Sequence, residues 1–240
     1  MIIKFFKDIL APKKCYSCKK EWFFLCEDCK KKLKNFSSIC YLCKKRSLNF
    51  RVHKLCKKNF LEKENKKFYM DNIIIFSHYK NFVIKKMIED FKFYWKKDLK
   101  EDFSKVLAEK FLKEFSKNNN FWDFIIIYPP MYFWKKIFRW YNSSEILAKE
   151  ISKILKIKIE KNLVKKIKNT KEQKFLSRQE RWTNLQNSFE INKNKVDKIF
   201  DKNIIIVDDI ISTWATLNEI SKILKKNKVK KIIWLIIASD

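Results

Sequence analysis

The chain of 240 residues contains no glycine. Average usage of about 7% would place about 17 glycines in a chain of this length, and glycine is the usual residue where φ is positive or where the backbone approaches a ligand closely. Eight tryptophans are present, and three of them, Trp95, Trp140 and Trp214, stand where a turn or a tight loop is expected. We hypothesise that at least some of these tryptophans are glycine codons, since UGA is read as tryptophan or glycine in different bacterial codes. The alternative is that tryptophan is genuine and the loop around Trp214 is altered.

The sequence also lacks long apolar runs and has few acidic residues. No run approaches the ~18 residues of a membrane span, and residues 1–10 are too short and too charged for a signal peptide. We interpret them as a small amphipathic helix packed on the body, and we expect a cytoplasmic protein. The net charge of +29, from 56 basic and 27 acidic residues, favours a phosphate or nucleic-acid partner. The lysines are spread along the whole chain, however, as AT-rich coding alone would also produce.

All seven cysteines fall within residues 13–56, and they form pairs separated by two residues. In the cytoplasm such pairs are more often metal ligands than disulfides, and side chains at this spacing can grip one ion from a tight turn. Thiolates with one imidazole favour Zn²⁺, in closed structural sites where the metal supplies folding energy. We expect sequential pairing, with interleaved pairing and a metal-free cluster as alternatives. The predicted ligands are Cys15, Cys18, Cys26, Cys29, Cys40, Cys43, His53 and Cys56.

The apolar pattern after residue 68 predicts an α/β domain with a mostly parallel sheet flanked by helices. Residues 57–67 are polar and are interpreted as a linker. The expected division is therefore an N-terminal helix and zinc module over residues 1–60 and an α/β domain over residues 68–240. Continuous apolar runs predict buried strands, and 3.6-residue spacing predicts helices. The expected strands are 73–79, 124–128, 203–207 and 229–238, and the expected helices are 82–93, 98–115, 145–155 and 217–226.

One stretch combines a buried strand with polar groups that suit a phosphate ligand. The strand 203–207 is followed by two adjacent carboxylates, Asp208 and Asp209. Hydroxyl groups then precede a helix, at Ser212, Thr213 and Thr216. Loop amides and a helix N-terminus can hold a phosphate, and carboxylates at the carboxyl end of a parallel strand can bind sugar hydroxyls or Mg²⁺. The alternative is a buried strand that ends in two solvated aspartates.

Two basic segments are candidates for contacts with anionic groups. Lys135, Lys136 and Arg139 follow a strand that Pro129-Pro130 closes, in a loop that suits pyrophosphate. Residues 163–189, which include Arg181, are rich in hydrogen-bonding side chains. They fit a lid that closes over an anionic substrate, and a mobile surface loop is the alternative.

Residues 203–216 resemble the ribose-phosphate signature of type I phosphoribosyltransferases, in which apolar residues precede Val-Asp-Asp, two variable positions, Thr-Thr-Gly and Ala-Thr. Here Ser212 takes the first Thr position and Trp214 the Gly position. Nearly the whole chain resembles the ComF family, which are competence-associated phosphoribosyltransferase-like proteins with an N-terminal zinc module. This sequence departs from the family's Arg-Gly-Phe/Tyr-Asn-Gln motif at two positions: Trp140 takes the Gly position and Ser143 takes the Gln position. The segments that carry the resemblance are the cysteine pairs, Phe91-Lys92-Phe93-Tyr94, Pro129-Pro130, Arg139-Trp140-Tyr141-Asn142, Asn169-Thr170, Gln173, Leu176-Ser177, Arg181, Asn184, Phe189 and Val207-Asp208-Asp209.

The resemblance implies a type I phosphoribosyltransferase fold, phosphoribosyl pyrophosphate with Mg²⁺ as ligand, and a role in DNA uptake or nucleotide metabolism. It assigns the ribose hydroxyls to Asp208 and Asp209, directly or through Mg²⁺, and lid closure to Arg181. Pyrophosphate is assigned to Lys135, Lys136 and Arg139, and the 5′-phosphate to Ile211, Ser212, Thr213, Trp214, Ala215 and Thr216. An indole at position 214 is expected to obstruct phosphate binding. The alternative function is a non-catalytic adaptor that binds single-stranded DNA or a helicase partner through the zinc module and a basic surface.

Overall fold

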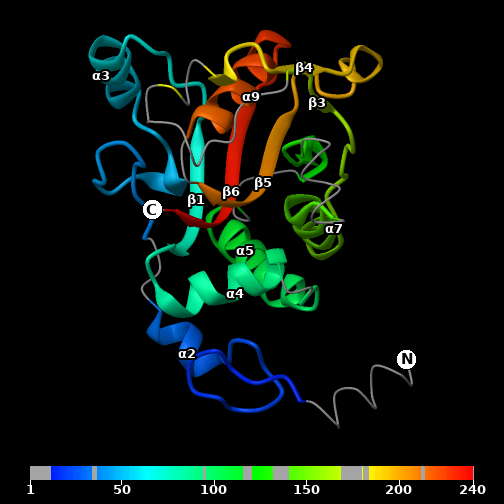
Figure 1. Ribbon diagram of the computed structural model, residues 1–240. Coiled ribbons are helices and arrows are strands. Elements are labelled where there is room, and N and C mark those ends of the chain that lie inside the picture. Colours follow the sequence, from blue (N-terminus) through cyan, green and yellow to red (C-terminus); the bar gives the residue numbers. More distant parts are fainter. Residues whose placement is uncertain are drawn as a thin grey trace.

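The computed structural model describes residues 12–33, 37–93, 96–115, 121–131, 141–168, 180, 184–211 and 214–239. Its centre is a four-stranded sheet in the order β1-β6-β5-β2, and all three strand pairs are parallel. A two-stranded antiparallel sheet, β3-β4, lies apart from it (Figure 1). The strands are β1 (Asn72–His78), β2 (Phe124–Ile127), β3 (Val164–Lys166), β4 (Phe189–Ile191), β5 (Asn203–Ile211) and β6 (Lys231–Ser239).

The two central strands are apolar along almost their whole length, as expected for strands covered on both faces. Eight of the nine residues of β6 are buried. Helices α4, α5 and α7 pack on one face of the sheet, and α9 packs on the other (Figure 1). The helices are α2 (Glu27–Lys32), α3 (Lys54–Glu64), α4 (Phe82–Phe93), α5 (Leu99–Phe115), α7 (Ser143–Leu155) and α9 (Trp214–Lys226), with 3₁₀ turns at Leu48–Phe50, Phe121–Asp123 and Lys193–Lys195.

The cysteine segment, residues 13–56, contributes to the core on both faces of the sheet. Cys15, Cys26 and Cys29 are buried in the same apolar cluster as α4 and α5. Cys40 is buried in the other apolar cluster, together with α9 and the strand side chains on that face of the sheet. The two halves of this segment therefore lie on opposite sides of the edge strand β1, with α2 next to α4 and α3 beside the other end of the sheet (Figure 1).

A polar cluster joins the first half of the cysteine segment to α4. The Tyr16 hydroxyl donates to Asp90 Oδ2 at 2.5 Å, and Lys96 and Lys86 form ion pairs with Asp90 at 2.8 and 3.1 Å. Because the Asp90 side chain is only 5% exposed, this charge is held by several partners, as a buried carboxylate requires. Burial opposes ionisation, but hydrogen bonds from Lys96 and Tyr16 lower the pKa of Asp90.

The structure confirms the predicted α/β class and most of the predicted elements. The interpretation of residues 57–67 as a linker is wrong, because α3 covers Lys54–Glu64 and ends at Asn65, which adopts φ 49. Leucine, lysine and glutamate favour helix, and this outweighed the polarity of the segment. Most bounds differ by one or two residues, and the largest differences are that β5 continues through the acidic pair to Ile211 and that α9 begins at Trp214. The predicted helix at residues 1–10 lies outside the described residues. No helix in the described part of the chain is long and apolar enough to cross a membrane.

Candidate functional site

The acidic pair lies where β5 extends beyond its neighbour β2. The last register pair between these strands is Ile127 with Ile206, whereas β5 continues alongside β6 to Ile211. Asp208 and Asp209 therefore have β6 on one side and the space beyond the end of β2 on the other. This is the position at the carboxyl end of a parallel strand where ligands bind in open α/β sheets.

Helix α7 begins in that space. Its N-cap is Asn142, whose side chain accepts hydrogen bonds from the backbone N–H groups of Ser144 and Glu145 at 3.1 and 3.4 Å. The same side chain donates to the carbonyl oxygen of Pro129 at 3.1 Å, which ties the helix to the chain that leaves β2. The positive end of the α7 dipole is thereby directed at the acidic pair.

The first turn of α7 contacts both carboxylates. The Ser144 hydroxyl donates to Asp208 Oδ1 at 2.5 Å, and the Ser143 hydroxyl donates to Asp209 Oδ2. Asp208 Oδ1 also accepts the backbone N–H of Asp209 at 2.9 Å. These contacts leave two carboxylates with a fixed orientation beside a helix N-terminus.

A lysine from α4 places a positive charge beside the acidic pair. Lys92 Nζ lies 2.8 Å from Asp209 Oδ1, and both side chains are largely buried. Burial and the adjacent charge of Asp209 raise the pKa of Asp208 to about 7, against hydrogen bonding from Ser144 and the charge of Lys92. The pair therefore changes charge near neutral pH, and a divalent cation would favour its fully ionised form.

The segment assigned to the 5′-phosphate is described in part. Ile211 and Ala215 are buried, and Thr216 is half-buried in the first turn of α9. Ser212 and Thr213 lie outside the described residues. The Trp214 indole packs against Phe60, Phe68 and Tyr41, with ring centroids 4.7, 5.3 and 6.0 Å away. The start of α9 thus contacts α3 and the second half of the cysteine segment. The expected obstruction of a phosphate by this indole stays a prediction.

Other predicted contacts lie outside the described residues as well. They are Lys135, Lys136, Arg139 and Arg181. Their assignments to pyrophosphate and to a lid therefore stay predictions.

The predicted metal ligands gather into two groups of four, as sequential pairing predicts. The ligand atoms of each group all lie within 4.8 Å of one another. In the second group, His53 Nδ1 lies 3.5 Å from Cys43 Sγ and 3.8 Å from Cys56 Sγ. The groups are Cys15, Cys18, Cys26 and Cys29, and Cys40, Cys43, His53 and Cys56.

The same tight turn carries the first pair of cysteines in both groups. Lys19 N–H donates to the Cys15 carbonyl, and Lys44 N–H donates to the Cys40 carbonyl, each at 2.9 Å. The two lysines adopt φ values of 67° and 60°. Two identical turns around clustered thiols are the arrangement of a zinc site, in which two ligands from a turn meet two from elsewhere.

The acidity of the thiols also fits a bound cation. Burial works against the Cys15 thiolate, but the backbone N–H groups of Cys18 and Cys26 lower its pKa to about 6. Burial and the neighbouring Cys43 raise the pKa of Cys56 to about 12. Clustered thiols resist simultaneous ionisation, and a central divalent cation removes that repulsion. These donor sets fit Zn²⁺.

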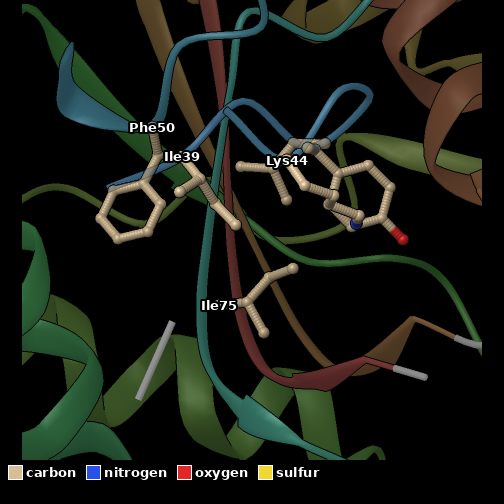
Figure 2. A pocket seen from close by; sticks show the side chains of 6 residues that line it. Ile39, Lys44, Phe50 and Ile75 are labelled. Carbon is tan, nitrogen blue, oxygen red and sulfur yellow. The ribbon is translucent and has the colours of Figure 1, made fainter. Parts of the chain in front are cut away.

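A small hollow lies between the second cysteine group and β1. Ile39, Lys44 and Phe50 come from the cysteine segment, and Ile75 comes from β1 (Figure 2). Tyr41 and Ile73 complete its walls. The Lys44 ammonium lies 4.1 Å from the centre of the Tyr41 ring. The hollow is mostly apolar and contains neither member of the acidic pair, so its walls pack the cysteine segment onto the sheet.

Sequence reasoning missed three contacts to the acidic pair. From the sequence alone, Lys92 is identified only within a segment that resembles the family and Ser143 only as a departure from the family motif, and Ser144 is given no role. A single signal was present: Asn142-Ser143-Ser144 opens a helix directly after the predicted pyrophosphate loop. Which carboxylates those hydroxyls reach depends on how far β5 extends past β2, and this is a tertiary property.

Comparisons with known proteins agree with this geometry. The phosphoribosyl transferase domain family matches residues 142–240, which include α7, β5, α9 and β6. Competence protein F of Haemophilus influenzae is 38% identical over 110 residues, 45% of this chain and 48% of that protein. The DNA utilization protein YhgH of Escherichia coli K12 is 29% identical over 97 residues, 40% of this chain and 41% of that protein. The chain thus spans about half the length of these curated relatives, and the matches confirm the predicted resemblance to the ComF family.

Proposed function

We propose that the protein binds phosphoribosyl pyrophosphate with Mg²⁺ and transfers its phosphoribosyl group to an acceptor, because residues 142–240 match the phosphoribosyl transferase domain family and the chain is similar to competence protein F. The names of the relatives support a role in competence or DNA utilization. The observation that carries the proposal is the acidic pair held by the first turn of α7.

In this reaction the bond between the sugar C1 and a pyrophosphate oxygen breaks, and positive charge develops on the sugar ring. The acceptor then supplies the electron pair for the new bond to C1. Asp208 and Asp209 are placed to accept hydrogen bonds from the ribose hydroxyls, in place of the serine hydroxyls that they now accept. Their negative charge also favours the cationic ring. When bound, Mg²⁺ supplies charge neutralisation for the departing pyrophosphate.

The direct test is calorimetric binding of phosphoribosyl pyrophosphate to the full chain in the presence of Mg²⁺. The double variant Asp208→Asn/Asp209→Asn is expected to bind at least tenfold more weakly, because it removes two charged acceptors. Asp123→Asn is the matched control, since Asp123 lies in a 3₁₀ turn, is half-exposed and pairs with Lys202. Unchanged binding by the double variant would refute the assignment.

The tryptophan hypothesis requires the same titration on a chain with glycine at seven tryptophan positions, with Trp234 kept because its side chain is fully buried in β6. Binding by the glycine chain alone supports both the site and the misread codons. Binding by both chains keeps the site and removes the argument about Trp214. A folded glycine chain that binds nothing overturns the transferase proposal.

The adaptor alternative is favoured by one feature, the exposed basic surface of α3. None of the residues of this helix is buried, and Lys54, Lys58 and Lys63 are exposed. Single-strand binding through such a surface would weaken steeply with salt, with a slope of about 0.7 per phosphate contact. Salt-sensitive binding without pyrophosphate release would support the adaptor, whereas pyrophosphate release with an acceptor would support the transferase.

A further inference from the structure

Lys92 contacts the acidic pair of the candidate site. It lies outside residues 142–240, the part of the chain that matches the phosphoribosyl transferase domain family. It occupies the last turn of α4, and its side chain is 15% exposed. Its ammonium group lies 2.8 Å from Asp209 Oδ1. A buried ion pair of this kind is weak support for stability, because desolvation of both charges offsets their attraction. Its position beside the acidic pair therefore invites a functional explanation.

The two residues that precede Lys92 are held by contacts with other parts of the chain. The preceding residue, Phe91, accepts a hydrogen bond on its carbonyl oxygen from the Tyr141 hydroxyl. Tyr141 directly precedes Asn142, the N-cap of α7. Asp90, one residue further back, binds Tyr16 and two lysines. These contacts anchor the end of α4, from which Lys92 extends a flexible four-carbon stem to Asp209, so its ammonium group can change partners without a movement of the helix.

The present partner of this ammonium group is also a preferred ligand of a divalent cation. Mg²⁺ binds carboxylate oxygens together with substrate phosphates. Lys92 and Mg²⁺ would therefore compete for Asp209, and each would neutralise the same charge. An ammonium group displaced from Asp209 would lie next to the phosphates that the cation brings with it. Lysine is well suited to this second contact, since it binds phosphate as a compact point charge.

We propose that Lys92 is a binding residue of this site whose ammonium group exchanges between Asp209 and the pyrophosphate moiety of the substrate, in competition with Mg²⁺. This proposal rests on the proposed function for the pyrophosphate contact, while the competition with Mg²⁺ rests on the ion pair alone. In this arrangement Asp209 has a positive charge beside it at every stage. The ion pair with Lys92 gives way to the cation, and Lys92 becomes a ligand for the anionic leaving group.

The test uses Lys92→Met in the full chain and two separate titrations, one with Mg²⁺ alone and one with inorganic pyrophosphate at saturating Mg²⁺. Methionine keeps the stem and removes the competing charge. Mg²⁺ is expected to bind about tenfold more tightly, and pyrophosphate about tenfold more weakly. Lys85→Met is the matched control, because Lys85 lies on the same helix and is exposed. It should change neither constant.

Lys92→Arg provides a second variant that keeps the charge and the fold. A guanidinium group can bind Asp209 through two parallel hydrogen bonds, so Mg²⁺ is expected to bind at least threefold more weakly than to the parent chain. Opposite signs for the two variants support the proposal. If Mg²⁺ affinity is unchanged in both variants, or falls in both, the competition is refuted. If Mg²⁺ affinity shifts as expected but no variant or parent chain binds pyrophosphate, the proposed function fails and the exchange partner is wrong.

Discussion

Trp22 and Trp234 occupy opposite environments, and their replacement by glycine should have opposite effects on stability. Trp22 has a φ angle of 75° and is 58% exposed. A left-handed conformation costs about 1–2 kcal/mol for a residue with a Cβ atom. Glycine removes that strain but makes the unfolded chain more flexible, which costs about 0.5–1 kcal/mol. Since an exposed indole loses little packing, Trp22→Gly should raise the free energy of unfolding by about 0.5–1 kcal/mol.

Trp234 lies in the middle of β6 and is fully buried. Its indole N–H donates to the Ser221 hydroxyl at 3.0 Å. Truncation of a buried tryptophan costs about 3–5 kcal/mol, and glycine within a strand adds about 0.5–1 kcal/mol. Trp234→Gly should therefore lower the free energy of unfolding by about 5 kcal/mol, which approaches the total stability of many domains.

Urea unfolding of each variant with saturating Zn²⁺ provides the assay, because the midpoint reports stability when the slope is unchanged. Trp122→Gly is the control, since Trp122 is 87% exposed and lies in a 3₁₀ turn. It should stay within about 0.5 kcal/mol of the parent chain. A loss of more than about 1 kcal/mol for Trp22→Gly would refute the backbone argument, and a tolerated Trp234→Gly would refute the burial argument. The expected contrast would show that the fold requires a large side chain at position 234 and accepts glycine at position 22.

Further predictions concern the acidic pair and the cysteine segment. Burial and the charge of Asp209 raise the pKa of Asp208 to about 7, so a proton competes with a cation for this carboxylate below that pH. Calorimetry should therefore show that Mg²⁺ binds about tenfold more tightly at pH 8 than at pH 6. The Asp208→Asn variant should show a flatter dependence of Mg²⁺ affinity on pH. Ser144→Ala removes the hydrogen bond to Asp208, so the pKa of Asp208 should rise and the same binding curve should move to higher pH. Asp90→Asn weakens the contacts with Tyr16 and two lysines and should lower the free energy of unfolding by about 2 kcal/mol; an unchanged urea midpoint would contradict this. Metal analysis should find two Zn²⁺ per chain, one for each ligand group. A strong chelator should make residues 15–56 sensitive to protease, whereas the same buffer without chelator and without thiol should leave them resistant.

Sequence patterns predicted the regular elements well because they depend on local composition. The runs that became β5 and β6 are apolar and uninterrupted, and the spacing in α4 and α5 follows the helical period. The cysteine pairs were also readable, since two ligands two residues apart can only meet a third and a fourth from another pair. Sequential pairing was the expected arrangement, with interleaved pairing as the alternative, and the two groups of four have it.

The contacts around the acidic pair were not readable in the same way. Lys92 and Ser144 are separated from the acidic pair by more than 60 positions in the chain, and no periodicity links them. Their approach depends on the strand order and on the short length of β2. Lysine is so common in this chain that an isolated example carries little information from the sequence alone.

The lack of glycine was also less restrictive than expected. Among the described residues, positive φ angles occur at eleven positions, and five of these are asparagine or aspartate. These two residues tolerate the left-handed conformation better than other residues with a Cβ atom. Asn65 and Lys156 end α3 and α7 in this way. The argument for misread codons therefore depends on particular tryptophans, with Trp22 as the example that the structure supports by its backbone angle.

The strand order has a consequence for how the chain folds during synthesis. Among the described residues, the strand that pairs with β1 in the main sheet is β6, and about 150 residues separate the two strands in sequence. As the ribosome extends the chain, β1 must wait without its strand partner until β6 emerges. The cysteine segment that flanks β1 is complete long before that, and Zn²⁺ can fold it locally. Metal capture would then give β1 a folded neighbour while its sheet partner is still being made, and zinc starvation would leave an apolar strand exposed during translation.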